Sequence, residues 1–292
     1  MQQNGNSQYT IDSTARHLKR LSQHCNLSEP ENITAYISSL NISNGYKINL
    51  YTAYTRFAKH YNIPFEKPKL RVEQKAISLP TQEKLNAFIN YARRGLALKL
   101  RISKYGLRPI EVVTLKAKDI DPEHKTISVT TAKHGAPRNI NIDQPLAETL
   151  KIFIQKTHKQ PNDYLFKKPE HDIPTTAMYF TKTFVAMRTR LAKVTNDPSI
   201  KGIKLYHFRH YFATMTQIKY KDVPTTAYML GHRSWKNTQV YVNLAKILEL
   251  GQDGDTYIVK TANTLKEYTD LLEQGFQYVS DYENLKVLRK RK

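Results

Sequence analysis

The stretch of sequence that decides the fold runs from residue 206 to residue 241. It opens with YHFRHYFAT (206–214), continues to LGH (230–232) and closes with TQVY (238–241). Between these blocks apolar residues recur with the period of short helices. The pattern places Arg209 early on one helix and His232 just after a second, with Tyr241 nine residues beyond it. Together these three side chains predict an anion site beside an oxygen nucleophile, which suits chemistry on a phosphodiester.

The composition of the 292-residue chain indicates a polyanionic partner. The chain carries 46 Lys and Arg residues against 25 Asp and Glu, a formal net charge of +21 and a pI near 9.8. Nucleic acid is the first candidate for such a surplus, and an anionic membrane surface is the second. No apolar run approaches the length of a membrane span, so we expect no membrane partner.

The charge is distributed unevenly along the chain. Residues 249–283 hold eight acidic and two basic residues, a net charge of −6, so the rest of the chain carries +27. The basic surface therefore lies mostly before residue 249. An acidic amphipathic helix near 265–276 is predicted either to pack on its own domain or to dock on another subunit, and a basic tail follows at 286–292.

Cysteine usage and the N-terminal residues favour a cytoplasmic protein. The single cysteine, Cys25, leaves no partner for an intrachain disulfide, and the polar start of the chain does not resemble a signal peptide. The histidines are scattered rather than set at ligand spacing, and no Gly-rich phosphate loop is present. We therefore expect no metal and no other cofactor.

The chain order predicts a mainly α protein with a small β-hairpin or sheet, an α+β fold. Residues 1–66 read as a small helical domain, residues 67–79 as a basic linker rich in proline, and residues 80–248 as a second domain. Residues 249–292 form a C-terminal segment of different composition. Alternation over residues 126–142 predicts the hairpin, with Lys133 in its turn.

The sequence GLRPIE (106–111) predicts the start of a helix. Pro109 suits the first helical position, which places Arg108 at the helix N-terminus. A cation is unfavourable there unless an anion arrives, because the helix dipole opposes it. Glu111 lies one helical turn further on, where its carboxylate could hold the Arg108 guanidinium in place.

The second domain resembles the catalytic domain of the tyrosine recombinases, the family of phage-type integrases and chromosome-dimer resolvases. Four blocks carry the resemblance, in the order GLRPIE (106–111), Lys133, RHYFAT (209–214) and LGH (230–232) with Tyr241. It spans roughly residues 80–245, and the preceding helical piece is similar to the family's core DNA-binding domain. The C-terminal segment is loosely similar to that of archaeal integrases.

The resemblance implies a role for each of these residues. Tyr241 would attack a backbone phosphorus of double-stranded DNA and form a 3′-phosphotyrosine, while Arg108 and Arg209 neutralise the phosphate oxygens. Lys133 would protonate the leaving 5′-oxygen, with Lys125 as the competing lysine. His232 would contact the phosphate or help to deprotonate the tyrosine. Glu111 would support Arg108, and the enzyme would act as a homo-tetramer on two duplexes.

One position departs from the family pattern. The family has histidine three residues before the second arginine, whereas this chain has Tyr206 there and His207 one place later. Residues i and i+3 share a helix face, so Tyr206 takes the place of the family histidine, and His207 is expected to be packed or exposed rather than catalytic. A phenol can donate a hydrogen bond to phosphate but is a poor base near neutral pH.

Two alternatives to a recombinase or integrase stay open from the sequence. A type IB topoisomerase-like enzyme that nicks and closes DNA would use similar residues. A catalytically decayed DNA-binding protein is the reading that the Tyr206 departure favours. The competing nucleophile is Tyr257, which lies in a segment that reads as a strand among acidic residues.

Overall fold

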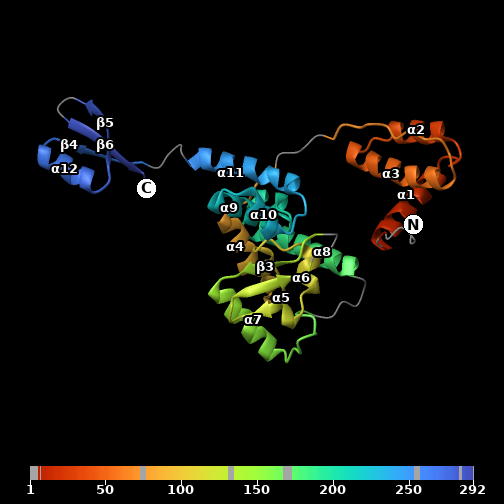
Figure 1. Ribbon diagram of the computed structural model, residues 1–292, viewed down its shortest axis with the longest axis horizontal. Coiled ribbons are helices and arrows are strands. Elements are labelled where there is room, and N and C mark those ends of the chain that lie inside the picture. Colours follow the sequence, from red (N-terminus) through yellow and green to blue (C-terminus); the bar gives the residue numbers. More distant parts are fainter. Residues whose placement is uncertain are drawn as a thin grey trace. The chain divides into compact units, whose positions relative to one another are not determined.

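The structure of the chain is a computed structural model that describes residues 6, 8–72, 77–130, 135–166, 173–252, 257–282 and 285–291. The backbone divides into two compact units, Met1–Ile77 and Ser78–Lys292 (Figure 1). Helices dominate both units, and small antiparallel sheets occur in the second. The predicted mainly α fold with small sheets is therefore confirmed.

The first unit is a bundle of three helices, α1 (Gln8–Ser22), α2 (Pro30–Ser39) and α3 (Asn44–His60). Ser43 caps α3 by accepting a hydrogen bond from the Tyr46 amide, as serine commonly does at this position. The core is formed by residues spaced along one face of each helix, namely Leu21, Ile33, Ile37, Leu50, Tyr51, Tyr54 and Ala58. The Lys67 ammonium donates to Thr52, 2.7 Å away, so the first residue of the expected linker lies against α3.

The second unit holds most of the chain's helices, and its core fixes the start of α9 (His207–Tyr220). Its other helices are α4 (Gln82–Tyr91), α5 (Arg94–Ser103), α6 (Pro109–Thr114), α7 (Gln144–Lys156), α8 (Ile173–Val194), α10 (Val223–Leu230) and α11 (Gln239–Gln252), with short 3-10 turns η2 (Ala117–Asp119), η3 (Pro198–Gly202) and η4 (Trp235–Thr238). Phe208 of α9 packs against Phe184 of α8 and Phe88 of α4, with ring centroids 6.1 and 6.3 Å apart. Because Phe208 is fully buried, its neighbour Arg209 is held at the domain interior.

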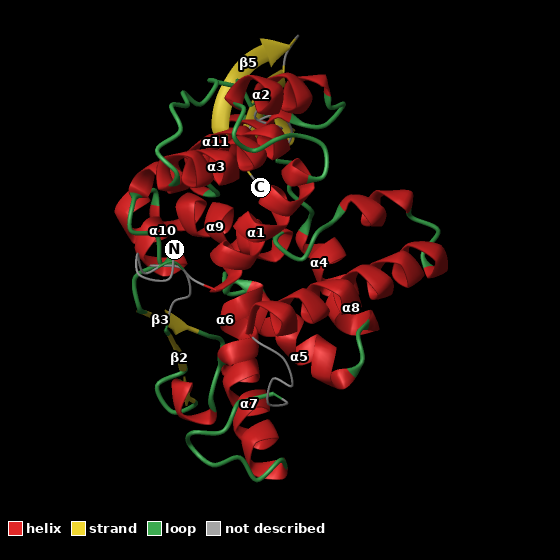
Figure 2. Ribbon diagram, turned by 90° about the vertical axis from the view of Figure 1, so that its right-hand side faces the viewer, coloured by secondary structure: helices red, strands yellow, loops and turns green. Residues whose placement is uncertain are grey.

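The predicted hairpin is present as β2 (Thr126–Val129) and β3 (Arg138–Asn141), which lie side by side (Figure 2). With β1 (Ile120–Asp121) they form a three-stranded sheet in the order β1-β2-β3. Ile127 pairs with Ile140 and Val129 pairs with Arg138. Alternate side chains point to one face of a strand, so Arg138 shares the buried face with Ile140. A charged residue on a buried face requires a partner.

The C-terminal residues form a second sheet with one helix. Strands β4 (Tyr257–Ala262), β5 (Gln277–Tyr282) and β6 (Leu285–Arg291) pair in the order β4-β6-β5, and α12 (Leu265–Glu273) follows β4. A small core of Ala262, Leu271, Phe276 and Leu288 joins the helix to the sheet. The residues expected to form a basic tail thus belong largely to the central strand of this sheet.

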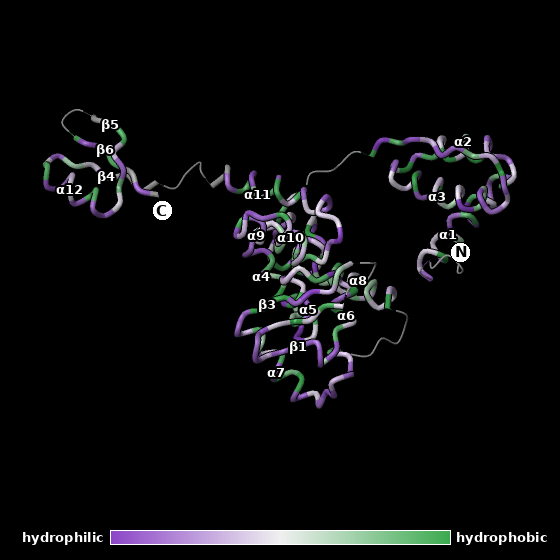
Figure 3. Tube along the Cα trace, viewed as in Figure 1, coloured by the Kyte–Doolittle hydropathy of each residue, from purple (hydrophilic) through white to green (hydrophobic). Residues whose placement is uncertain are grey.

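Within the described ranges no helix is both long and apolar enough to cross a bilayer. Hydrophobic and hydrophilic segments alternate along the helices of both units (Figure 3).

Candidate active site

Two helix ends provide the backbone frame of the site. The last carbonyls of a helix lack partners within the helix, and at the end of α10 two arginines supply them. Arg138 Nε donates to the Met229 carbonyl at 2.8 Å, and Arg209 Nη2 donates to the Leu230 carbonyl at 2.6 Å. Arg209 also donates to the carbonyl of Gly106, the residue that precedes the α6 turn. These contacts tie α6, α9, α10 and β3 together.

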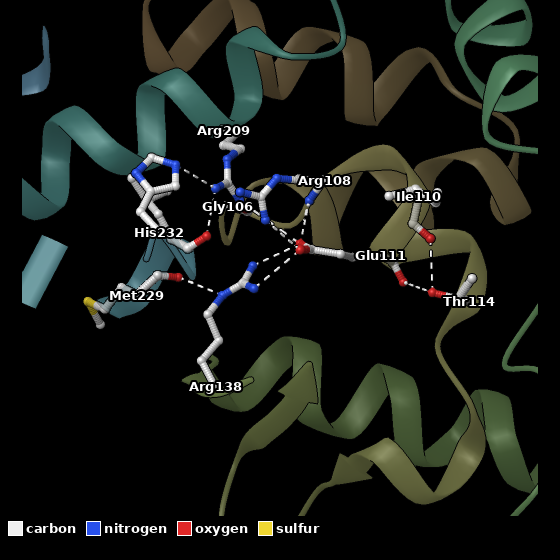
Figure 4. A network of polar contacts seen from close by, with 10 residues as sticks. Gly106, Arg108, Ile110, Glu111, Thr114, Arg138, Arg209, Met229 and His232 are labelled. Carbon is white, nitrogen blue, oxygen red and sulfur yellow. Dashed lines mark hydrogen bonds and ion pairs between the residues drawn. The ribbon is translucent and has the colours of Figure 1, made fainter. Parts of the chain in front are cut away.

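A single buried carboxylate, that of Glu111, lies at the centre of this frame (Figure 4). Its oxygens accept hydrogen bonds from Arg108 Nη1 at 2.8 Å and from Arg138 Nη2 at 2.8 Å. They also accept from the Arg108 amide at 2.8 Å, so that the Glu111 side chain caps the start of α6. Arg209 Nη1 lies 3.9 Å from the same carboxylate. The contact predicted between Arg108 and Glu111 is therefore present, within a larger network.

The network carries more positive than negative charge. Three guanidinium groups surround one carboxylate, and Arg209 Nε is buried without a hydrogen-bond partner. Burial, together with the charge of Arg108, lowers the pKa of Arg209 to about 10, so the side chain is still cationic at neutral pH. Buried unpaired charge is costly, and an anion bound here would offset that cost.

His232 follows the residue that caps α10, and both of its ring nitrogens are hydrogen-bonded. Its Nε2 lies 3.1 Å from Arg209 Nη2, and because a guanidinium only donates, Nε2 must accept. Its Nδ1 lies 2.9 Å from the Thr238 hydroxyl, which leaves Nδ1 as the protonated nitrogen that donates. Burial, then the charges of Arg209 and Arg108, lower the pKa of His232 to about 4. The imidazole is therefore neutral at physiological pH.

Tyr241 lies in the first turn of α11 and is 3% exposed. It packs in a small apolar cluster with Ala213 and Leu230. Its hydroxyl forms a 3.0 Å hydrogen bond with Nδ1 of His210. Burial raises the pKa of Tyr241 to about 12, while the charge of Arg209 acts in the opposite direction. The phenol is thus neutral and enclosed.

Tyr206 lies at the N-cap of α9, at the edge of the site. Its side chain is 40% exposed, and its ring packs edge-on against His210 at a centroid distance of 5.1 Å. His207 is half-buried and its Nδ1 accepts from the Lys204 amide at 3.3 Å. Tyr206 therefore stands beside the arginine cluster, and His207 is engaged by the backbone before α9.

Three further residues were candidates from the sequence, two lysines as the general acid and one tyrosine as the nucleophile. Lys133 lies outside the described residues. Lys125 is exposed and directly precedes β2. Val129, the residue that pairs with Arg138, lies at the other end of that strand. Tyr257 begins β4, whose backbone pairs with β6 in the C-terminal sheet. The structure thus gathers Arg108, Glu111, Tyr206, Arg209, His232 and Tyr241 in one region of the second unit.

Three residues of the site were not singled out from the sequence: Arg138, His210 and Thr238. A signal for Arg138 existed, because it alternates in sequence with the buried residues Ile140, in the same strand, and Ile142, directly after it. His210 and Thr238 gave no such signal, since their partners lie 31 and 6 residues away and meet them only in the folded chain. Among the described residues no group of His, Cys, Asp and Glu is arranged to hold a metal ion.

Comparison with known proteins identifies similar sequences. The model of the phage integrase family matches residues 80–247. The chain is 26% identical over 195 residues to tyrosine recombinase XerA of Saccharolobus solfataricus, a match over 66% of this chain and 61% of that protein. It is 26% identical over 178 residues to a tyrosine recombinase of Pseudothermotoga lettingae, over 61% and 59%. The chain thus spans about three-fifths of the length of these relatives.

Solved structures share the fold at lower identity. The Tn1549 transposon integrase in complex with transposon right-end DNA has a TM-score of 0.66 and 16% identity, over 85% of this chain and 94% of that one. The XerH site-specific recombinase bound to a palindromic difH substrate has a TM-score of 0.56 and 18% identity, over 82% and 78%. These likenesses establish the fold of the chain.

Proposed function

The chain belongs to the phage integrase family, and on that premise we propose that it is a site-specific DNA recombinase that cuts and rejoins DNA through a 3′-phosphotyrosine. The observation that supports this most strongly is the cluster of Arg108, Arg138 and Arg209 around one buried carboxylate, with Tyr241 packed beside it. The excess positive charge fits a phosphodiester, and the phenol is the nucleophile that the reaction requires.

In the proposed cleavage step the Tyr241 oxygen forms a bond to phosphorus and the bond from phosphorus to the 5′-oxygen breaks. Arg108 and Arg209 neutralise the charge that grows on the non-bridging oxygens. His232 orients Arg209 by accepting a hydrogen bond from its Nη2, and Lys133 protonates the leaving 5′-oxygen. The phosphotyrosine conserves the energy of the broken bond, so a 5′-hydroxyl of another strand can reverse the step.

The resting position of Tyr241 adds a requirement to this mechanism. A phenol that is 3% exposed cannot meet a phosphorus atom of DNA. Attack therefore requires the apolar packing around Tyr241 to open when DNA binds. Glu111 of α6, which is itself held by Arg138 of β3, keeps Arg108 and Arg209 in place when Tyr241 is uncovered, because its carboxylate lies against both guanidinium groups.

The proposed substrate is double-stranded DNA, and the proposed assembly is a homo-tetramer. The net charge of +21 favours binding to a polyanion. Exchange between two duplexes requires four strand cleavages, and four copies of a one-tyrosine site supply them. The DNA complexes of the Tn1549 integrase and of XerH are consistent with this substrate class.

A covalent-trapping experiment tests the proposal. Wild type and Tyr241→Phe are incubated with labelled duplexes that carry a randomised core and nicks at staggered positions, so that the short strand released by cleavage diffuses away. Adducts that resist denaturation are recovered and their DNA is sequenced to obtain a preferred duplex. We expect adduct from wild type and none from Tyr241→Phe, because the phenylalanine lacks the nucleophilic oxygen.

The outcomes separate the competing functions. Equal adduct from both proteins would refute Tyr241 as the nucleophile. Adduct from neither would favour a protein that only binds DNA. If wild type forms adduct, transfer of strands between two labelled copies of the preferred duplex identifies a recombinase, whereas relaxation of supercoiled DNA without transfer identifies a topoisomerase-like enzyme.

A further inference from the structure

The hydroxyl of Tyr241 is held by an imidazole that the family resemblance does not assign to the reaction. His210 follows Arg209 directly in α9, and its Nδ1 lies 3.0 Å from the Tyr241 oxygen. The two rings are 5.7 Å apart and inclined by 47°. The side chain of a residue on α9 thus touches the reacting atom of a residue on α11.

None of the other candidate bases has this contact. The nitrogens of His232 are both engaged, one by Arg209 and the other by Thr238. Tyr206 offers a phenol, which has little affinity for a proton near neutral pH. His207 is turned toward the Lys204 amide. Among the described residues of the site, His210 is therefore the imidazole in position to take a proton from Tyr241.

The protonation states favour a hydrogen bond from the phenol to the imidazole. Burial, then the positive charge associated with His207 and Arg209, lower the pKa of His210 to about 4, so the ring is neutral and has one nitrogen with a lone pair. Burial keeps the proton on Tyr241 at neutral pH. A phenol that donates to Nδ1 directs its own lone pairs away from His210, as an attacking oxygen requires.

We propose that His210 is a catalytic residue that orients the Tyr241 hydroxyl and accepts its proton during cleavage, an inference that rests on the proposed function. As the Tyr241 oxygen bonds to phosphorus, its O–H bond breaks and the proton moves to His210 Nδ1, which becomes an imidazolium. The bond from phosphorus to the 5′-oxygen breaks, and that oxygen takes its proton from the general acid. In the rejoining step the imidazolium returns the proton to Tyr241.

Substrate binding itself would make His210 a better base. In the resting chain the groups that face the imidazole are Tyr206, His207 and Arg209 of α9 and Tyr241 of α11. These groups present positive or neutral charge, which opposes protonation of the ring. A phosphodiester bound by Arg209 adds a negative charge nearby, which favours the imidazolium. The proton therefore stays on Tyr241 until DNA is bound.

The test compares rates of adduct formation on the preferred nicked duplex in a single turnover. His210→Ala removes the acceptor and is expected to slow adduct formation by about 10²–10⁴-fold, the range typical of a general base. His210→Asn places an acceptor oxygen near Nδ1 that cannot carry the proton, and we expect a rate at least about tenfold below wild type. His207→Ala is the matched control, and its rate should stay within about threefold of wild type because His207 is not bonded to Tyr241.

The pH profile separates a base from a structural support. The deficit of His210→Ala should shrink as pH rises from 6 to 9.5, because hydroxide then takes over removal of the proton. A wild-type rate in His210→Asn, or an equal deficit at every pH in both variants, would overturn the proposal. Thermal unfolding shows whether each variant is folded. If His210→Ala does not fold, the rate of His210→Asn decides the test.

Tyr241→Phe separates a failure of this inference from a failure of the proposed function. If Tyr241→Phe still forms adduct, the nucleophile is misassigned and the proposed function fails. If Tyr241→Phe is inert while both His210 variants keep the wild-type rate, the proposed function stands and the role of His210 is refuted.

Discussion

Arg108 and Arg209 carry the same charge but are held differently. Arg209 is 1% exposed and fixed by two backbone carbonyls, whereas the side chain of Arg108 is 19% exposed and pairs with Glu111. Arg209 therefore supports the fold as well as the site. Arg108 is the better residue for testing phosphate recognition apart from stability.

Replacing Arg108 with lysine tests the need for a planar fork of donors. Arg108→Lys keeps the charge but not the paired geometry, so we expect adduct formation to slow by about 10²–10³-fold with the unfolding temperature nearly unchanged. Single-turnover trapping and thermal unfolding measure the two quantities. Arg93→Lys, at an exposed position before α5, is the control and should behave as wild type. A wild-type rate in Arg108→Lys would contradict the role of Arg108.

Glu111 should have a measurable effect on stability and on its pH dependence. Removing its charge leaves the buried Arg138 guanidinium uncompensated, so Glu111→Gln is expected to lower the free energy of unfolding by about 3–5 kcal/mol. Chemical denaturation measures this loss. Glu249→Gln, which alters an exposed pair with Lys221, should cost less than about 1 kcal/mol.

The pH dependence follows from the pKa of Glu111. Burial by itself would raise this pKa, but the hydrogen bonds and charges of Arg138 and Arg108 outweigh burial and hold it below its usual value. A carboxyl with a lowered native pKa stabilises the fold above its unfolded pKa, about 4.3, and loses that contribution as pH falls through the native value. The difference between wild type and Glu111→Gln should therefore narrow in acid. A constant difference would contradict the ion pair.

At the scale of the element, the end of α10 is the junction on which the site depends. Gly231 ends the helix with a φ of +63°, a conformation that L side chains rarely adopt. A Cβ there would lie 2.6 Å from Arg138 Nη1 and 3.0 Å from the Ala136 carbonyl. The turn that presents His232 and the guanidinium that holds Glu111 therefore compete for the same space, and only glycine leaves room for both.

Gly231→Ala is expected to disturb both stability and activity. The left-handed backbone alone costs about 1–2 kcal/mol, and displacement of Arg138 adds to this. Denaturation should show that loss, and adduct formation should slow by about tenfold or more as Glu111 loses a partner. Gly202→Ala, whose Cβ meets nothing within 4 Å, is the control and should be nearly neutral. Normal stability in Gly231→Ala would contradict the described junction.

Some contacts between helices and strands could be predicted from the sequence, and others could not. The helix starts, the hairpin and the approach of Arg108 to Glu111 followed from local spacing, since i and i+3 residues meet on any helix. The contact of His210 with Tyr241 could not be predicted from local spacing, because the packing of α9 against α11 decides which of their residues meet. The expected basic tail became the central strand β6 because β4 and β5 supply its backbone partners, which no local pattern in 286–292 reveals.

For the whole molecule, charge should govern DNA affinity independently of the chemistry. Binding that releases counterions from six to ten phosphates weakens by about 10³–10⁵-fold between 50 and 200 mM salt. We expect the chain, with its net charge of +21, to follow this steep dependence on the preferred duplex. Tyr241→Phe should show the same slope, because the phenol contributes no charge. A flat response, measured by fluorescence anisotropy, would contradict a phosphate-directed binding surface.

The most direct test of the account is to find the residue that carries the DNA. The trapped adduct is digested with nuclease and trypsin, and the peptide that bears a nucleotide is sequenced by mass spectrometry. Cleavage at lysine gives NTQVYVNLAK (237–246), in which Tyr241 is the only tyrosine, and ILELGQDGDTYIVK (247–260), which contains Tyr257. The account predicts the nucleotide on Tyr241 in the first peptide. A nucleotide on Tyr257, or on any other peptide, would contradict it.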